Sequence, residues 1–301
     1  MTPITPTSRL TAADFDQELL ILFDAYVHGD LDRRGFLDRA QKFAVGGLTA
    51  VGILASLQPN FAAAQVIPAG DTRVKTETVT VSSPDGYGSI KAYVAKPANA
   101  SGKLPAVLVI HENRGLNPHI EDIARRIALD GYVAFAPDAL TPLGGYPGDE
   151  DKARTEFAKL DQAKTRNDFL ASYAALKARA DVTAKIGAVG FCYGGGIVHF
   201  LSTRLPDLAA GVPFYGNHPA AEDAAKVKSP LQIHFAGIDE RINAAWPAYE
   251  AALKAAGARY VAHTYPNTQH GFNNDTTPRF DTVAAKLAWE RTMAFFKQNL
   301  S

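Results

Sequence analysis

Cys192 is the single cysteine of the 301-residue sequence, and its neighbours make it a candidate nucleophile. It stands at the centre of residues 190–194 (GFCYG), a cysteine version of the G-x-S-x-G elbow that joins a strand to a helix. The glycines leave room for the sharp turn, and the positive end of the helix dipole favours a thiolate. The alternative is that Cys192 is a small buried hydrophobic residue, the usual role of a free cysteine. One cysteine also excludes an intrachain disulfide.

Asp239 and His270 follow Cys192 in one of the chain orders that catalytic triads use: nucleophile, acid, histidine. In such a triad His270 accepts the thiol proton, and Asp239 holds the imidazole in the productive tautomer. The backbone N–H groups of Asn113 and Tyr193 are expected to form the oxyanion hole. Taken singly, Asp239 fits a turn former and His270 fits a structural histidine. Their order behind the elbow favours the catalytic interpretation.

The elements that must position these residues form an alternating pattern over residues 65–301. Buried strands that alternate with helices predict an α/β fold, with a mostly parallel central sheet and helices on both faces. The expected strands are residues 76–81, 90–95, 106–110, 132–136, 186–191, 211–214, 231–236 and 260–265. The expected helices include residues 120–129, 149–164, 167–178 and 281–298. Ligands bind at the carboxyl ends of the strands in such sheets, and the candidate residues all follow strands.

Five segments together resemble the dienelactone hydrolase family, the carboxymethylenebutenolidase-like α/β-hydrolases. They are residues 111–115 (HENRG), 136–138 (APD), 190–196 (GFCYGGG), 237–239 (GID) and 270–272 (HGF). The resemblance extends from about residue 76 to the end of the chain and implies an α/β-hydrolase fold. It also implies that Glu112 matches the family's glutamate, which contacts the resting nucleophile and helps to generate the thiolate when substrate binds. A carboxylate beside a thiolate must act conditionally, because like charge alone raises the thiol pKa.

The sequence departs from the best-known family members at the substrate-binding arginines. Those members carry one arginine shortly after the proline–aspartate pair, where this chain has residues 139–142 (ALTP), and another four residues after the catalytic histidine, where this chain has Asn274. Arg114 and Arg241 lie beside candidate site residues and are candidate replacements for binding an anionic group; the alternative for each is a solvated surface arginine. Tyr146 is a further candidate substrate-binding residue. Tyr215, Trp246 and Phe272 are candidate pocket walls.

Metal and nucleic-acid functions are not expected. His111, Glu112 and His119 do not have the spacing of an H-E-x-x-H zinc motif and fall in a loop, so no metal site and no cofactor are predicted. The 31 basic and 31 acidic residues cancel, which excludes a strong electrostatic footprint for nucleic acid. The expected partner is a small-molecule ester or lactone substrate, bound by a monomer or a homodimer.

Residues 1–64 form a separate N-terminal segment. Residues 11–29 have helical periodicity, and Arg33 and Arg34 precede an uncharged apolar run at 43–57 and an A-x-A site at 62–64. This order resembles a twin-arginine export signal cleaved after Ala64, which predicts a periplasmic or exported enzyme in residues 65–301. The residues before the arginine pair are acidic, unlike an ordinary signal. The alternative is therefore a retained helical arm on a cytoplasmic protein. The apolar run is too short for a membrane span.

The sequence therefore predicts a hydrolase that cleaves a lactone, carboxylic ester or thioester through an acyl-thioenzyme on Cys192. Two alternatives stay open. One is a non-catalytic small-molecule binding protein on the same fold, which an unreactive Cys192 would indicate. The other is an acyltransferase with the same triad, which product analysis with added acceptors would distinguish.

Overall fold

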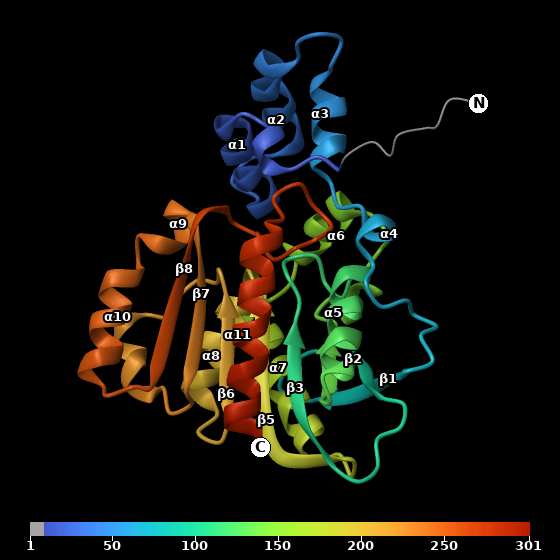
Figure 1. Ribbon diagram of the computed structural model, residues 1–301, viewed down its shortest axis with the longest axis vertical. Coiled ribbons are helices and arrows are strands. Elements are labelled where there is room, and N and C mark those ends of the chain that lie inside the picture. Colours follow the sequence, from blue (N-terminus) through green and yellow to red (C-terminus); the bar gives the residue numbers. More distant parts are fainter. Residues whose placement is uncertain (1–8) are drawn as a thin grey trace.

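The computed structural model describes residues 9–301, which contain an eight-stranded sheet in the order β1-β2-β4-β3-β5-β6-β7-β8 (Figure 1). Strands β3 to β8 are mutually parallel, whereas β1 pairs with β2 and β2 pairs with β4 in antiparallel fashion. The predicted α/β-hydrolase fold with a mostly parallel sheet is thus confirmed. The strands are β1 (Val74–Ser83), β2 (Gly88–Pro97), β3 (Leu104–Ile110), β4 (Val133–Pro137), β5 (Val182–Phe191), β6 (Ala210–Phe214), β7 (Leu231–Ile238) and β8 (Tyr260–Gln269).

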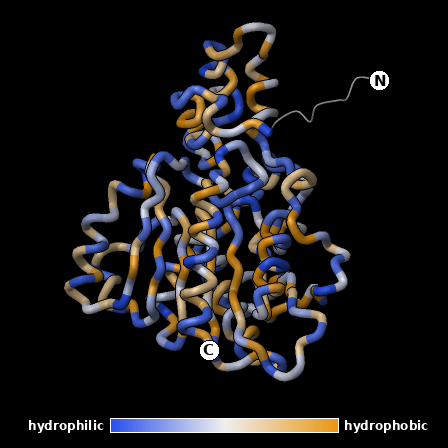
Figure 2. The backbone as a smooth tube through the Cα atoms, viewed as in Figure 1, coloured by the Kyte–Doolittle hydropathy of each residue, from blue (hydrophilic) through white to orange (hydrophobic). Residues whose placement is uncertain are grey.

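Helices cover both faces of this sheet. The α-helices of the body are α5 (Pro118–Leu129), α6 (Glu150–Phe157), α7 (Gln162–Lys177), α8 (Tyr193–Arg204), α9 (Glu240–Asn243), α10 (Trp246–Ala255) and α11 (Thr282–Leu300). Successive residues of the central strand β3 contribute to two different cores, because side chains alternate across a strand. Val107 and Val109 belong to the core that contains α5 and α11, and Leu108 belongs to the core that contains α7 and α8. Figure 2 shows hydrophobic residues along these central strands.

The N-terminal segment forms a small helical unit with its own core. Its helices are α1 (Gln17–His28), α2 (Arg33–Ala40), α3 (Ala50–Leu57) and the short α4 (Phe61–Ala64). The first three bury Phe23, Phe36, Leu54 and their neighbours against one another. Figure 1 shows this unit above the carboxyl ends of the parallel strands, the edge at which the sequence places the chemistry. In the described residues, no helix has both the length and the apolar character needed to cross a membrane.

The junction between two predicted helices lies earlier in the chain than the sequence predicts. Instead of helices at 149–164 and 167–178, the chain forms α6 and α7 with a break at residues 158–161. Asp161 causes this break, because its side chain accepts hydrogen bonds from the backbone N–H groups of Ala163 and Lys164 and thereby starts α7. The break separates α6, which contacts the N-terminal unit, from α7, which covers the sheet.

The remaining short elements are 3-10 turns. They are η1 (Ala12–Asp14), η2 (Gln41–Phe43), η3 (Thr141–Leu143) and η4 (Ala221–Lys226).

Candidate active site

Cys192 occupies a strained backbone position between β5 and α8. Its φ of 53° and ψ of −110° lie outside the regions that a side chain with a Cβ prefers. Its N–H donates to the carbonyl of Phe214 at 3.0 Å, which fixes the turn to the neighbouring strand β6. Such strain at the N-terminus of a helix is the geometry of a nucleophile elbow.

The glycines on either side of Cys192 are required by close backbone approaches. A Cβ at Gly190 would lie 2.2 Å from the carbonyl oxygen of Gly194. A Cβ at Gly194 would lie 2.3 Å from the carbonyl oxygen of Ile110, at the end of β3. Backbone atoms cannot move aside as a flexible side chain can, so only glycine fits at both positions.

His270 and Asp239 lie together beside this elbow. The Nδ1 atom of His270 is 2.6 Å from the Oδ2 atom of Asp239, and both residues are buried. The pair comes from the ends of β8 and β7, which are neighbouring parallel strands. The Nε2 atom of His270 has no hydrogen-bond partner among the described residues, and a nitrogen of the same ring lies within 4.8 Å of the sulfur of Cys192. The Asp239 carboxylate therefore fixes the ring and leaves Nε2 free for a reaction.

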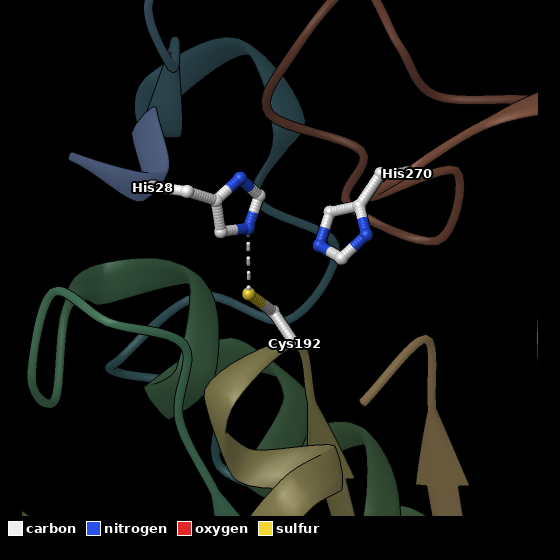
Figure 3. A group of neighbouring side chains, drawn as sticks. All are labelled: His28, Cys192 and His270. Atoms are coloured by element: carbon white, nitrogen blue, oxygen red, sulfur yellow. Dashed lines mark hydrogen bonds between the residues drawn. The ribbon is translucent and has the colours of Figure 1, made fainter. Parts of the chain in front are cut away.

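A histidine from the N-terminal unit also reaches the sulfur. The Nε2 atom of His28, at the end of α1, lies 3.3 Å from the Sγ atom of Cys192. The rings of His28 and His270 stand nearly perpendicular, with centroids 4.7 Å apart, and they approach Cys192 from two sides (Figure 3). His28 is not among the site residues that the sequence predicts. Its only local signal is a position at the end of a helical pattern before Gly29, which many surface histidines share.

The charges around the sulfur favour the thiolate. Burial raises the pKa of the Cys192 thiol, but the positive charges of His28 and His270 outweigh it and lower that pKa to about 6. Burial likewise lowers the pKa of His270, and the thiolate together with Asp239 raises it to about 10. These opposite shifts describe a thiolate–imidazolium pair at neutral pH.

Glu112 lies near the site. The resemblance implies that it contacts Cys192, but its hydrogen bond in the structure is to Asn274. Its Oε2 atom accepts a hydrogen bond from the Nδ2 atom of Asn274 at 3.0 Å. Asn274 stands where the best-known family members have a substrate-binding arginine. The hydrogen-bonded neighbour of the sulfur is instead His28.

Of the two expected oxyanion-hole residues, Tyr193 directly follows Cys192, and Asn113 lines the same small cavity as Cys192. Tyr193 is the first residue of α8, where backbone N–H groups have no partner within the helix. Its ring is held against Phe157, with centroids 4.7 Å apart. Asn113 follows β3, and its side chain donates from Nδ2 to the carbonyl of Val27 at 2.9 Å. The side chain of Asn113 thus holds α1, and its backbone is placed at the carboxyl edge of the sheet.

The three candidate substrate-binding residues lie in different environments. Arg114 is buried rather than solvated, and it donates to Asn113 and to the carbonyl of Val27, so it holds the N-terminal unit. Arg241, on α9, reaches the site, with its Nη2 atom 3.0 Å from Nε2 of His28. Tyr146 donates its hydroxyl to Glu150 at 2.9 Å and lines none of the described cavities that contain Cys192.

Two cavities border Cys192. The first lies between α1 and the elbow and has a volume of about 30 Å³, which is the volume per molecule in liquid water. The second measures about 490 Å³ and is lined by Tyr193, Phe200, Asn217 and His218 as well as Cys192. Only the second is in the size range of small-molecule sites.

The histidines that the sequence analysis considered for metal binding are engaged elsewhere. His111 is buried and accepts the N–H of Ala139 at 3.1 Å, and His119 pairs with Asp275 at 3.3 Å. Within residues 9–301, the group that offers metal-ligating atoms within 4.8 Å of one another is His28, Cys192 and His270. Two imidazoles and a thiolate are donors that suit zinc.

Comparison with known proteins agrees with this geometry. The profile of the dienelactone hydrolase family matches residues 90–300. The chain belongs to the dienelactone hydrolase family. A second profile, described as YqhI-like, matches residues 6–45, in the N-terminal segment. The family match makes the protein a hydrolase of the carboxylic-ester type.

Individual relatives cover the body of the chain. A protein named "Putative carboxymethylenebutenolidase" from Escherichia coli K12 is 31% identical over 267 residues, which span 81% of this chain and 97% of the relative. "Putative hydrolase fragment YghX" from the same strain is 51% identical over 114 residues, 38% of this chain and 97% of the fragment. The crystal structure of a "Putative Dienelactone Hydrolase" from Klebsiella pneumoniae has a TM-score of 0.66 and 30% identity, and covers 74% of this chain and 99% of that one.

Proposed function

We propose that this hydrolase cleaves a lactone, carboxylic ester or thioester through an acyl-thioenzyme on Cys192. The observation that carries the proposal is the strained elbow at Cys192 beside the buried His270–Asp239 pair, whose nitrogen and oxygen are 2.6 Å apart. Strain at a nucleophile and a carboxylate-oriented histidine are the parts that acyl transfer needs.

In the first step, the Cys192 thiolate attacks the substrate carbonyl carbon and a C–S bond forms. The C–O bond to the leaving alcohol breaks, and the alcohol takes the proton from Nε2 of His270. The carbonyl oxygen, negative in the tetrahedral intermediate, is stabilised by the N–H groups of Tyr193 and Asn113. Asp239 stabilises the imidazolium.

In the second step, His270 takes a proton from water, and the resulting hydroxide attacks the thioester. The C–S bond breaks, the acid leaves, and the Cys192 thiolate and the His270 imidazolium are restored. For a lactone, the alcohol and the acid remain in one molecule. The cavity of about 490 Å³ beside Tyr193 is the proposed substrate pocket, because the space beneath α1 holds only about 30 Å³.

The test is a screen of lactones, aryl esters and acyl-thioesters against the wild type, Cys192→Ala and Cys192→Ser. We expect Cys192→Ala to abolish turnover and Cys192→Ser to retain a small fraction, because the geometry suits oxygen but the hydroxyl pKa does not. Wild-type turnover in Cys192→Ala would refute the proposal. Product analysis with added alcohols and amines separates hydrolysis from acyl transfer, and a wild type without any turnover would favour a binding protein.

We also propose that the N-terminal segment, residues 1–64, directs export. Arg33 and Arg34 begin α2, and Arg34 keeps its side chain 91% exposed, as a receptor-read signal requires. The helices around this pair pack on the enzyme body, where Arg33 pairs with Asp151 at 2.6 Å. Exchange of both arginines for lysine should leave the protein in the cytoplasm; an unchanged periplasmic fraction would contradict the export proposal.

A further inference from the structure

The C-terminal end of α1 is fixed over the active site by a set of specific contacts. The carbonyl of Val27 accepts hydrogen bonds from Asn113 at 2.9 Å and from Arg114 at 3.2 Å. Asp24, one turn earlier, pairs with Arg279 at 3.2 Å. Gly29 then ends the helix with a left-handed φ of 89°. These contacts hold His28 in one place, so its approach to Cys192 is built into the fold.

His28 is oriented in the same way as His270. Its Nδ1 atom lies 2.8 Å from the backbone carbonyl of Asp24 and 3.3 Å from the carboxylate of that residue. With Nδ1 engaged in this way, Nε2 of His28 faces two neighbours, the Sγ atom of Cys192 at 3.3 Å and the Nη2 atom of Arg241 at 3.0 Å. The sulfur therefore faces two histidines from opposite ends of the chain (Figure 3), and an aspartate contacts Nδ1 of each.

We propose that His28 is a second catalytic histidine, contributed by the N-terminal segment, which hydrogen bonds to Cys192 and holds it as a thiolate in the free enzyme. This inference rests on the proposed function of Cys192 as nucleophile. It assigns to His28 the contact with the resting nucleophile that the resemblance gives to Glu112, whose carboxylate is bound by Asn274.

A metal ion among His28, Cys192 and His270 explains the geometry less well. The guanidinium of Arg241 lies 3.0 Å from Nε2 of His28, the atom that would bind the metal, and 3.5 Å from Nδ1 of His270. A fixed cation at that distance repels a metal ion and attracts an anion. The guanidinium thus opposes a metal ion at Nε2 of His28, and the sulfur of Cys192 is left facing two imidazoles.

Other charged groups face His28 from each element packed against it. The additional cations are Arg114, after β3, and Arg279, after β8; the anions are Asp24 on α1, Glu112 after β3 and Glu150 on α6. Of these, Asp24 makes the direct contact with the His28 ring. Asp24 and the thiolate favour the imidazolium form of His28, whereas burial and the nearby cations oppose it.

The test measures the pH dependence of Cys192 alkylation by iodoacetamide in the full chain. The variants are His28→Ala, His28→Gln, which keeps volume without charge, and Gln17→Ala. Gln17→Ala is the matched control, because Gln17 docks α1 through Gln269 without contacting the sulfur. An opposite charge within about 4–6 Å shifts a pKa by about 1–3 units. We expect both His28 variants to raise the midpoint by at least about one unit, which lowers the rate at pH 6 by about fivefold.

Imidazole in the buffer should partly restore the rate of His28→Ala, and Gln17→Ala should titrate as the wild type does. A purely structural role of His28 would leave the midpoint unchanged or move it equally in Gln17→Ala. Either result would overturn the inference. Loss of turnover in Cys192→Ala with an unchanged midpoint in the His28 variants would leave the proposed function standing. Turnover that persists in Cys192→Ala would instead refute the proposed function.

Discussion

The amide of Asn274 donates to the carboxylate of Glu112 at 3.0 Å, and this contact joins the position that the resemblance assigns to nucleophile activation with the one that it assigns to a substrate-binding arginine. At position 274 the chain lacks the cation that clamps a substrate carboxylate in the best-known members. The neutral amide instead satisfies an anion of the protein itself. The site thus has the glutamate after β3 and a neutral amide at position 274.

Glu112→Gln should separate thiolate formation from substrate turnover. The glutamine keeps the size of Glu112 and can still bond to Asn274, but it has no charge. The hydrogen bond from Asn274 changes from the charge-assisted to the neutral class, a difference of about 1 kcal/mol, and the resemblance assigns the lost charge to thiolate generation when substrate binds. The kcat/KM for esters should therefore fall by at least about fivefold. The alkylation midpoint of Cys192 should not rise, because its neighbours in the free enzyme are His28 and His270. An upward shift as large as that of His28→Ala would contradict this division of roles.

Asp239→Asn should remove activity without unfolding the site. The amide cannot stabilise the His270 imidazolium and favours the wrong tautomer, so kcat should fall about 10³–10⁴-fold. Asp239 also accepts a hydrogen bond from the N–H of Ile242 and thereby starts α9, a cap that asparagine makes equally well. The thermal midpoint should therefore stay close to that of the wild type. A kcat within tenfold of the wild type would show that Asp239 does not orient His270.

The alkylation profile of the wild type should reveal the thiolate–imidazolium pair. Only the thiolate reacts, and the pKa of Cys192 is lowered to about 6. The rate should therefore rise as the pH increases through about 6, well below the midpoint of about 8.5 for an ordinary thiol. The raised pKa of His270, about 10, predicts a plateau between pH 7 and 9. Cys192→Ser serves as the blank, and a single midpoint near 8.5 would rule out the pair.

Gly194→Ala and Gly196→Ala form a matched test of the elbow. A Cβ at Gly194 would lie 2.3 Å from a backbone oxygen, whereas the nearest atom to a Cβ at Gly196 is 3.5 Å away. Gly194→Ala should therefore destabilise the protein by at least about 1–3 kcal/mol, the usual effect of overpacking. Gly196→Ala should have equal or slightly higher stability, because alanine favours a helix. Thermal unfolding measures both, and equal melting temperatures would contradict the close approach.

The fold could be predicted from the sequence because the pattern of apolar residues that defines each strand and helix can be recognised locally along the chain. Alternating apolar runs define β3 to β8, and parallel strands bring the residues after β5, β7 and β8 to one edge, which places Cys192, Asp239 and His270 near one another. The break before α7 could not be predicted from the helical periodicity of apolar residues, because it depends on one capping side chain, Asp161.

The contact of His28 with Cys192 could not be predicted in the same way. It depends on how an independent helical unit docks on the body, through the hydrogen bonds of Val27 to Asn113 and Arg114. Hydrophobic periodicity shows which face of α1 is buried, but not what lies beyond its last residue. The burial of Arg114 could not be predicted for the same reason, since an arginine that is solvated and one that binds the N-terminal unit have the same sequence pattern.

Two proposals for the N-terminal segment make opposite predictions for the native, active protein: cleavage after Ala64 removes His28, and a catalytic role of His28 requires that it is kept. Cleavage after Ala64 would remove His28 and expose the space above Cys192, so an enzyme that depends on His28 must keep α1. We therefore expect intact-mass measurement of the active fraction to find a chain that still contains residues 17–28, whether or not the protein is exported. An active pool that begins at Gln65 would refute the catalytic role of His28 and support signal cleavage, whereas an intact segment would refute cleavage. Comparison of the alkylation midpoint before and after isolation controls for proteolysis during purification.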